Sequence, residues 1–139
     1  GRADEGAELL HLINTAAKYM GQTGRLYGGE PYALAGDVYA NPECPGRVGW
    51  SQYTGSAGWF YTAVMGSLLG LRPKGKILTM HPHLPENWPG YALEIRLNGT
   101  PLSIRVSRGQ GEASLQVDGV PAESIPLDGK SHKVEYDMA

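Results

Sequence analysis

A chain of 139 residues is long enough for a modest hydrophobic core, and 41% hydrophobic with 19% charged residues is an ordinary globular balance. The formal net charge of −2 provides no basic field, so nucleic acid is not an expected partner. No apolar run approaches the roughly 20 residues that span a membrane, and no signal-peptide pattern precedes the first helical segment, so the chain is expected to begin within a domain. The single cysteine, Cys44, is compatible with a reducing compartment and has no base partner that would indicate catalysis.

The first half of the sequence is typical of helices joined by a long loop. Apolar residues recur every three or four positions over 4–20, which predicts an amphipathic helix with Asp4 as N-cap and Gly21 as its stop. A second helical pattern covers 56–71 and ends before Arg72-Pro73, because the residue before a proline disfavours the α region. The segment between them, 22–53, is rich in Gly, Pro and aromatic residues, and we interpret it as an ordered loop of the active-site type.

The second half is typical of strands. Residues 93–97 and 102–106 alternate in polarity around Asn98-Gly99, which predicts a β-hairpin, and 77–81, 113–117 and 132–136 are further strand candidates. Strands at this spacing favour an antiparallel sandwich, with the Pro-rich segment 81–90 as a covering loop. Two helices are too few to close a helical core, so the sequence predicts the end of a larger α+β protein.

Three groups of residues are candidates for chemistry. Thr54, Gly55 and Ser56 precede the second helix, where free N–H groups and hydroxyls are able to hold phosphate, although Ser or Thr in this position is far more often a simple N-cap. In the long loop Glu30-Pro31-Tyr32 and Asp37-Val38-Tyr39 place carboxylates beside aromatic rings, as sugar sites do, yet solvated loop acids have the same composition. His81 and His83 have the spacing of metal ligands on a strand, but Pro82 and Pro85 favour structural or surface histidines, and we assign no metal.

Several ordered motifs resemble one family. They are Glu30-Pro31-Tyr32, 36–39 (Gly-Asp-Val-Tyr), 46–50 (Gly-Arg-Val-Gly-Trp), 53–59 (Tyr-Thr-Gly-Ser-Ala-Gly-Trp), 69–75, 82–91, 115–119 and 125–132. Together they resemble the carboxy-terminal signature of the glycoside phosphorylases of glycoside hydrolase family ninety-four, a group that includes cellobiose phosphorylase. The last two motifs look most like its cyclic β-1,2-glucan synthase branch.

The resemblance implies a fold and a set of roles. It implies that residues 1–72 are the last helices and loops of an (α/α)6 barrel and that 73–139 form a jelly-roll-like β-sandwich. Thr54 and Gly55, with Ser56 beside them, match the phosphate-binding position, and Glu30 and Tyr32 match the sugar site. Trp50 and Gln52 lie next to the phosphate loop as further sugar-lining residues.

The family's chemistry is inverting phosphorolysis of a β-glucoside, with inorganic phosphate as co-substrate and no cofactor. Its catalytic aspartate is expected upstream, so no catalytic residue is assigned here and the fragment alone is expected to be inactive. The expected partners are a β-glucan oligosaccharide, phosphate or glucose 1-phosphate, and the remainder of the barrel. The implied location is a bacterial cytoplasm or the cytoplasmic side of an inner-membrane parent protein.

Two other functions remain open at this point. One is a non-catalytic carbohydrate-binding or accessory β-sandwich, and the other is a degenerate remnant that only mediates assembly. Helices that lack their barrel neighbours would expose apolar faces able to drive self-association. The family usually has glycine where Val48 stands and an aromatic residue where Gln52 stands, so local sugar contacts differ from the common pattern.

Overall fold

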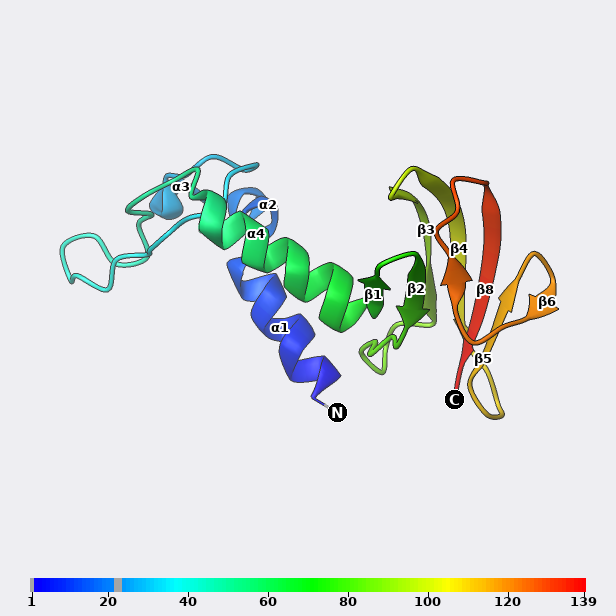
Figure 1. Ribbon diagram of the computed structural model, residues 1–139. Coiled ribbons are helices and arrows are strands. Elements are labelled where there is room, and N and C mark those ends of the chain that lie inside the picture. Colours follow the sequence, from blue (N-terminus) through cyan, green and yellow to red (C-terminus); the bar gives the residue numbers. More distant parts are fainter. Residues whose placement is uncertain (1, 22–23) are drawn as a thin grey trace. The chain divides into compact units, whose positions relative to one another are not determined.

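The computed structural model describes residues 2–21 and 24–139 (Figure 1). Contacts divide the described chain into two compact units, 2–65 and 66–139. The first unit is helical with long loops and the second consists mostly of strands. The boundary expected after residue 72 concerns the domains of a parent enzyme and stays a prediction.

The helical unit begins with two short helices where the sequence predicts one. Helix α1 covers Ala3–Ile13 and α2 covers Thr15–Met20. Asn14 between them is extended, and its side-chain Oδ1 accepts hydrogen bonds from the N–H groups of Ala16 and Ala17, at 3.1 and 3.4 Å. The prediction of one continuous helix was therefore wrong, because an asparagine that caps a new helix competes with helix continuation.

The start of α1 differs from the predicted one, whereas the end of α2 agrees with it. Arg2 occupies the N-cap position of α1, whereas Asp4, the predicted cap, lies in the first turn. A carboxylate in that turn still interacts favourably with the helix dipole. Gly21 ends α2 as predicted.

The second predicted helix starts and ends earlier than expected. Helix α4, Thr54–Thr62, continues directly as the π-helix η1, Ala63–Leu68, and Leu71 already belongs to strand β1. Gly70 makes the turn between them with φ +75°, and a Cβ at this position would collide with the backbone of His81. Only glycine fits this close approach, so the helix cannot continue to Leu71.

The loop between α2 and α4 contains one short helix and a pair of antiparallel segments. Helix α3 covers Gly24–Tyr27, and Val38 forms an isolated antiparallel bridge with Val48. The Tyr39 N–H donates to Arg47 O at 2.8 Å, and the Val48 N–H donates to Tyr27 O at 2.9 Å. Backbone hydrogen bonds therefore hold the described part of this loop in place.

Two sheets make up the second unit (Figure 1). An antiparallel sheet has the order β1-β2-β7, and a larger sheet has the order β3-β4-β8-β5-β6. The bounds of the strands, in chain order, are β1 Leu71–Lys74, β2 Ile77–Met80, β3 Gly90–Leu97, β4 Thr100–Arg108, β5 Ser114–Val117, β6 Val120–Pro121, β7 Ile125–Pro126 and β8 His132–Met138. The strands predicted from alternation are all present, and Asn98 and Gly99, both with positive φ, turn the β3–β4 hairpin.

One strand pair departs from the predicted antiparallel arrangement. Strands β4 and β8 run parallel, with Leu102 opposite His132 and Val106 opposite Tyr136. Inward side chains of both sheets form the buried core of this unit, which is compatible with a β-sandwich. They include Leu78, Met80, Leu102, Ile104, Val106, Ile125 and Val134.

The Pro-rich segment 81–89 is held to the larger sheet by Arg108 at the end of β4. Its guanidinium donates to the carbonyl oxygens of Trp88, Leu84 and Pro85, at 2.8, 3.1 and 2.7 Å. The Tyr91 hydroxyl donates to Leu69 O at 2.7 Å, and burial raises the pKa of this tyrosine. These bonds satisfy carbonyl groups that irregular backbone would otherwise leave unpaired.

Candidate functional site

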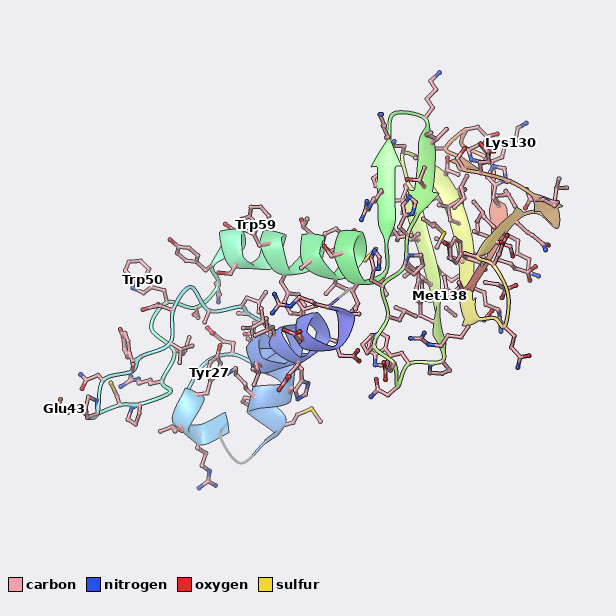
Figure 2. The ribbon with its side chains drawn as sticks, turned by 90° about the horizontal axis from the view of Figure 1, so that it is seen from below. Tyr27, Glu43, Trp50, Trp59, Lys130 and Met138 are labelled. Atoms are coloured by element: carbon pink, nitrogen blue, oxygen red, sulfur yellow. The ribbon has the colours of Figure 1, made fainter. Side chains whose placement is uncertain are left out.

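The candidate site is built on two antiparallel stretches of the helical unit, 34–39 and 46–53. The Gly36 N–H donates to Trp50 O at 2.7 Å, and the Tyr53 N–H donates to Leu34 O at 3.1 Å. The Trp50 N–H donates to Asp37 Oδ1 at 2.9 Å. Both backbone polar groups of Trp50 are thus occupied, while the residue is 68% exposed and its ring projects from the ribbon (Figure 2).

Glu30 is brought to this stretch by side-chain contacts. Its Oε1 accepts hydrogen bonds from Ser51 Oγ at 3.2 Å and from Gln52 Nε2 at 3.4 Å. Its own backbone N–H, then Ser51, hold the pKa of Glu30 below its ordinary value. Gln52 has a left-handed backbone, φ +56°, which is uncommon for a residue other than glycine.

The second carboxylate oxygen of Glu30 is unsatisfied. Oε2 is buried and has no hydrogen-bond partner among the residues that the structure describes. A buried charged oxygen without a donor is costly, so this atom is suited to accept a hydrogen bond from a bound hydroxyl or water.

Packing under the Glu30 loop fixes its base. Thr15 is buried, and its hydroxyl donates to Pro31 O at 3.1 Å. Tyr27 is also buried, with Lys18 Nζ lying 5.5 Å from the centre of its ring. Burial, then the negative charge of Glu30, raises the pKa of Tyr27. Tyr32, in contrast, is 82% exposed.

The amino terminus of α4 follows this cluster directly. Ala57 N–H bonds to Tyr53 O at 3.2 Å, so the N–H groups of residues 54–56 precede the first helical bond. Tyr53, at the N-cap position, makes no side-chain cap bond within the described chain. A Cβ on Gly55 would meet none of the described atoms within 4 Å, so a ligand is able to approach the backbone there.

Two cavities show which predicted residues lie together. Gly55 and Ser56 line a cavity of about 790 Å³ with Asp37, Tyr53 and Lys18, and its remaining walls are mostly apolar. Trp50 lines a second cavity of about 280 Å³, which Asp37 and Tyr53 also line.

Four of the predicted residues lie outside both linings: Glu30, Tyr32, Gln52 and Thr54. Asp37 was visible in the sequence as a carboxylate beside aromatics, but its link to Trp50 was not. Lys18 gave no sequence signal, because a lysine on an amphipathic helix is usually a solvated residue.

The histidine pair gives no sign of a metal centre. His81 and His83 are both exposed. Across residues 2–21 and 24–139 no group of three or more His, Cys, Asp or Glu side chains is arranged to hold a metal ion. None of the described helices is long and apolar enough to cross a membrane.

Comparison with known proteins finds similarity to carbohydrate-active enzymes. Residues 71–134 match the family model described as glycosyl hydrolase family 65, C-terminal domain. The chain is similar to glycoside phosphorylases and to a cyclic β-1,2-glucan synthase, as its motifs indicate. The matching domain is named for family 65, whereas the motifs resemble family ninety-four.

Individual relatives agree with this resemblance. The chain is 43% identical over 108 residues to cyclic beta-(1,2)-glucan synthase NdvB of Rhizobium meliloti, a match that covers 77% of this chain and 4% of the relative. It is 32% identical over 121 residues to solabiose phosphorylase of Paenibacillus borealis, a match that covers 80% of this chain and 16% of the relative. It is 29% identical over 99 residues to N,N'-diacetylchitobiose phosphorylase of Vibrio proteolyticus, a match that covers 68% of this chain and 12% of the relative. The chain therefore spans only a small part of each relative.

Proposed function

We propose that this chain supplies one wall of the sugar and phosphate site of an enzyme that synthesises or phosphorolyses β-glucans. In this proposal Thr54, Gly55 and Ser56 bind phosphate, and the sugar contacts come from Glu30, Tyr32, Trp50 and Gln52. Inorganic phosphate or glucose 1-phosphate is the co-substrate and no cofactor takes part. The general acid comes from the rest of the enzyme, so the fragment alone turns over no substrate.

One observation carries the proposal. Ser51 and Gln52, immediately before the amino terminus of α4, donate hydrogen bonds to Glu30, so a carboxylate is bonded to the segment that leads into the helix. A carboxylate with a free acceptor suits a sugar hydroxyl, and helix N–H groups suit an anion. The names of the relatives, a cyclic β-(1,2)-glucan synthase, a solabiose phosphorylase and an N,N'-diacetylchitobiose phosphorylase, support a sugar and a phosphate as ligands.

The surroundings of the site also support a barrel context. Both α1 and α4 are fully described, and neither contains a buried residue. Apolar helices of this kind normally pack against neighbours. We infer that α1 to α4 are the last helices of an (α/α)6 barrel whose other helices cover them, and that the terminal sheets form a jelly-roll-like sandwich.

The decisive variant is Thr54→Val in the complete parent enzyme. Loss of one hydroxyl donor to phosphate should lower kcat/KM for phosphate. The lost transition-state stabilisation should be about 2–4 kcal/mol, by analogy with an oxyanion-hole donor. Thr62→Val is the matched control, because Thr62 lies on the same helix and its hydroxyl donates to Gly58 O instead. Unchanged phosphate kinetics in Thr54→Val would refute the assigned role.

A non-catalytic carbohydrate-binding module predicts a different result. Calorimetric titration of the chain with β-1,2-linked glucan oligosaccharides, with and without phosphate, separates the two functions. Tight binding that ignores phosphate would favour the binding module. Binding that is weak alone and strengthened by phosphate supports the shared site.

A further inference from the structure

The stretch that carries the proposed site has no regular secondary structure, so its shape depends on a few specific bonds. Three of them join it to residues 36 and 37: Trp50 N–H to Asp37 Oδ1 at 2.9 Å, Gly36 N–H to Trp50 O at 2.7 Å, and Gly49 N–H to Asp37 O at 3.1 Å. Asp37 thus accepts hydrogen bonds from two consecutive residues of the opposite stretch: its backbone oxygen from Gly49 and its side chain from Trp50. It is also the carboxylate that lines both cavities of the site.

The space around Gly49 indicates how closely this carboxylate is fitted. A Cβ built on Gly49 would collide with both carboxylate oxygens of Asp37. Glycine at position 49 therefore lets the carboxylate reach the backbone of the next residue. Likewise, a Cβ at Gly36 would lie 3.0 Å from the ring of Tyr53, so the chain is also tightly packed at the other end of the stretch.

We propose that Asp37 is the positioning residue of the sugar site, fixing the Trp50 backbone and through it the direction of the Trp50 ring and the place of Ser51. The inference rests on the proposed function, because it concerns the same site. Asp37 acts through Trp50 and Ser51 and is assigned no contact with the reacting atoms. An ionised acceptor suits this task because hydrogen bonds to charged groups are stronger than those between neutral groups.

The position of Trp50 also affects Glu30, because the two are linked through Ser51. Ser51 is the next residue after Trp50, and its hydroxyl donates to Glu30 Oε1. If the Trp50 backbone moves, the Ser51 hydroxyl moves with it and Glu30 loses a donor. Removing the Asp37 carboxylate should therefore disturb two sugar contacts at once, an effect that a displacement of about 1 Å is enough to produce.

The test uses the full chain with Trp59 and Trp88 replaced by Phe, so that tryptophan fluorescence reports Trp50 alone. In this reference protein we compare Asp37→Ala, Asp37→Asn and Glu43→Ala. Asparagine keeps an oxygen acceptor at the Oδ1 position, and Glu43 is a carboxylate at the exposed tip of the same loop (Figure 2). The readouts are the anisotropy of Trp50 without ligand and its titration with a β-1,2-linked glucan oligosaccharide.

Asp37→Ala should lower the anisotropy and weaken oligosaccharide binding about tenfold, the equivalent of one lost charge-assisted hydrogen bond. Asp37→Asn should restore part of both, because its amide oxygen accepts a weaker, neutral hydrogen bond, and Glu43→Ala should change neither. Equal anisotropy and equal affinity in Asp37→Ala and the reference protein would overturn the assignment. A drop in affinity with unchanged Trp50 anisotropy would also overturn it, because the ring would then be fixed by other contacts.

Two further outcomes are separable. If the reference protein binds no oligosaccharide, this chain alone does not form a sugar-binding module, and the anisotropy of Asp37→Ala alone still decides the role of Asp37. If Asp37→Ala does not fold, hydrogen exchange of the Trp50 amide in the reference protein decides. Slow exchange supports the Asp37 bond, and exchange as fast as at the Glu43 tip contradicts it.

Discussion

His132, at the start of β8, lies between two carboxylates of the sheet unit. Its Nδ1 lies 2.7 Å from Asp118 Oδ2 and its Nε2 lies 3.0 Å from Asp128 Oδ1, while only 10% of its side chain is exposed. Both aspartates lie in turns, one after β5 and the other before β8. A ring with a carboxylate at each nitrogen is most stable as the imidazolium, which donates to both.

The pKa shifts of the three groups agree with this arrangement. The hydrogen bond to Asp118, then that to Asp128, raises the pKa of His132 above 6.5. The His132 ring holds the pKa of Asp118 below 3.8, and the Lys130 N–H, then His132, does the same for Asp128. Since the folded pKa of His132 is raised, its stabilisation is complete below pH 6.5 and is lost as pH rises through the folded pKa.

We expect His132→Gln to lower the free energy of unfolding most between about pH 4 and 6, where the ring is charged and both carboxylates are ionised. The difference from the unmodified chain should shrink as pH rises above 6.5, and also as pH falls through the lowered pKa values of the aspartates. Urea unfolding at a series of pH values measures it. The exposed His81, changed to Gln, is the control and should give no such profile. A difference that does not vary with pH would contradict a charged ring.

Single residues were predictable from the sequence where a local rule fixes them. Gly21 ends its helix, and Asn98 with Gly99 turns a hairpin, because their backbone preferences act over a few residues. The links of Asp37 to Trp50 and of Glu30 to Ser51 join residues 13 and 21 positions apart. No periodicity or spacing contains such contacts, so the sequence named Glu30 and Trp50 without showing how they are held.

At the scale of elements, the break between α1 and α2 shows how one side chain divides a helix. The apolar period runs through 4–20 without interruption, yet Asn14 turns its side chain back on the next two N–H groups. The two segments are therefore separate helices that meet at residue 14. A capping side chain therefore outweighs a continuous hydrophobic pattern here.

Asn14→Ala should destabilise the helical unit by about 1 kcal/mol, the usual cost of removing an N-cap. Asn14→Ser, which keeps a capping oxygen, should recover most of the loss. Thermal unfolding followed by far-ultraviolet circular dichroism measures both. Equal stability of the alanine variant would mean that the cap contributes nothing and that packing alone fixes the break.

The elements that the sequence missed are those defined by their neighbours. Strand β1 contains Pro73, and β7 consists of Ile125 and Pro126 only, so neither has an alternating pattern of its own. Both exist because β2 lies between them and supplies their hydrogen bonds. The parallel pairing of β4 with β8 is likewise a tertiary choice, since alternation specifies the face of a strand but not the direction of its partner.

At the scale of the whole molecule, the two units differ in how much apolar surface they bury. The sheet unit has a continuous set of buried aliphatic side chains, whereas the buried apolar residues of the helical unit are Tyr27 and Ala33. Large side chains on its helices remain exposed. They include Leu9, Leu12, Ile13, Met20, Trp59 and Tyr61.

An exposed apolar surface of this kind should associate with a second copy of the chain. Sedimentation velocity over a wide range of chain concentrations should show a mass that increases with concentration. Replacing Leu9 and Leu12 of α1 by Glu should shift the chain toward the monomer, because both positions are more than half exposed and would carry charge into the contact.

The control for this prediction is Val120→Glu in β6, an equally exposed apolar residue of the sheet unit. It should leave the association unchanged if the helices form the contact. A chain that is monomeric at all concentrations would instead show that the helical unit is satisfied by its own packing. The barrel proposal would then lose the support that it draws from the exposed faces of α1 and α4, while the phosphate and sugar roles would still depend on Thr54→Val and on oligosaccharide binding.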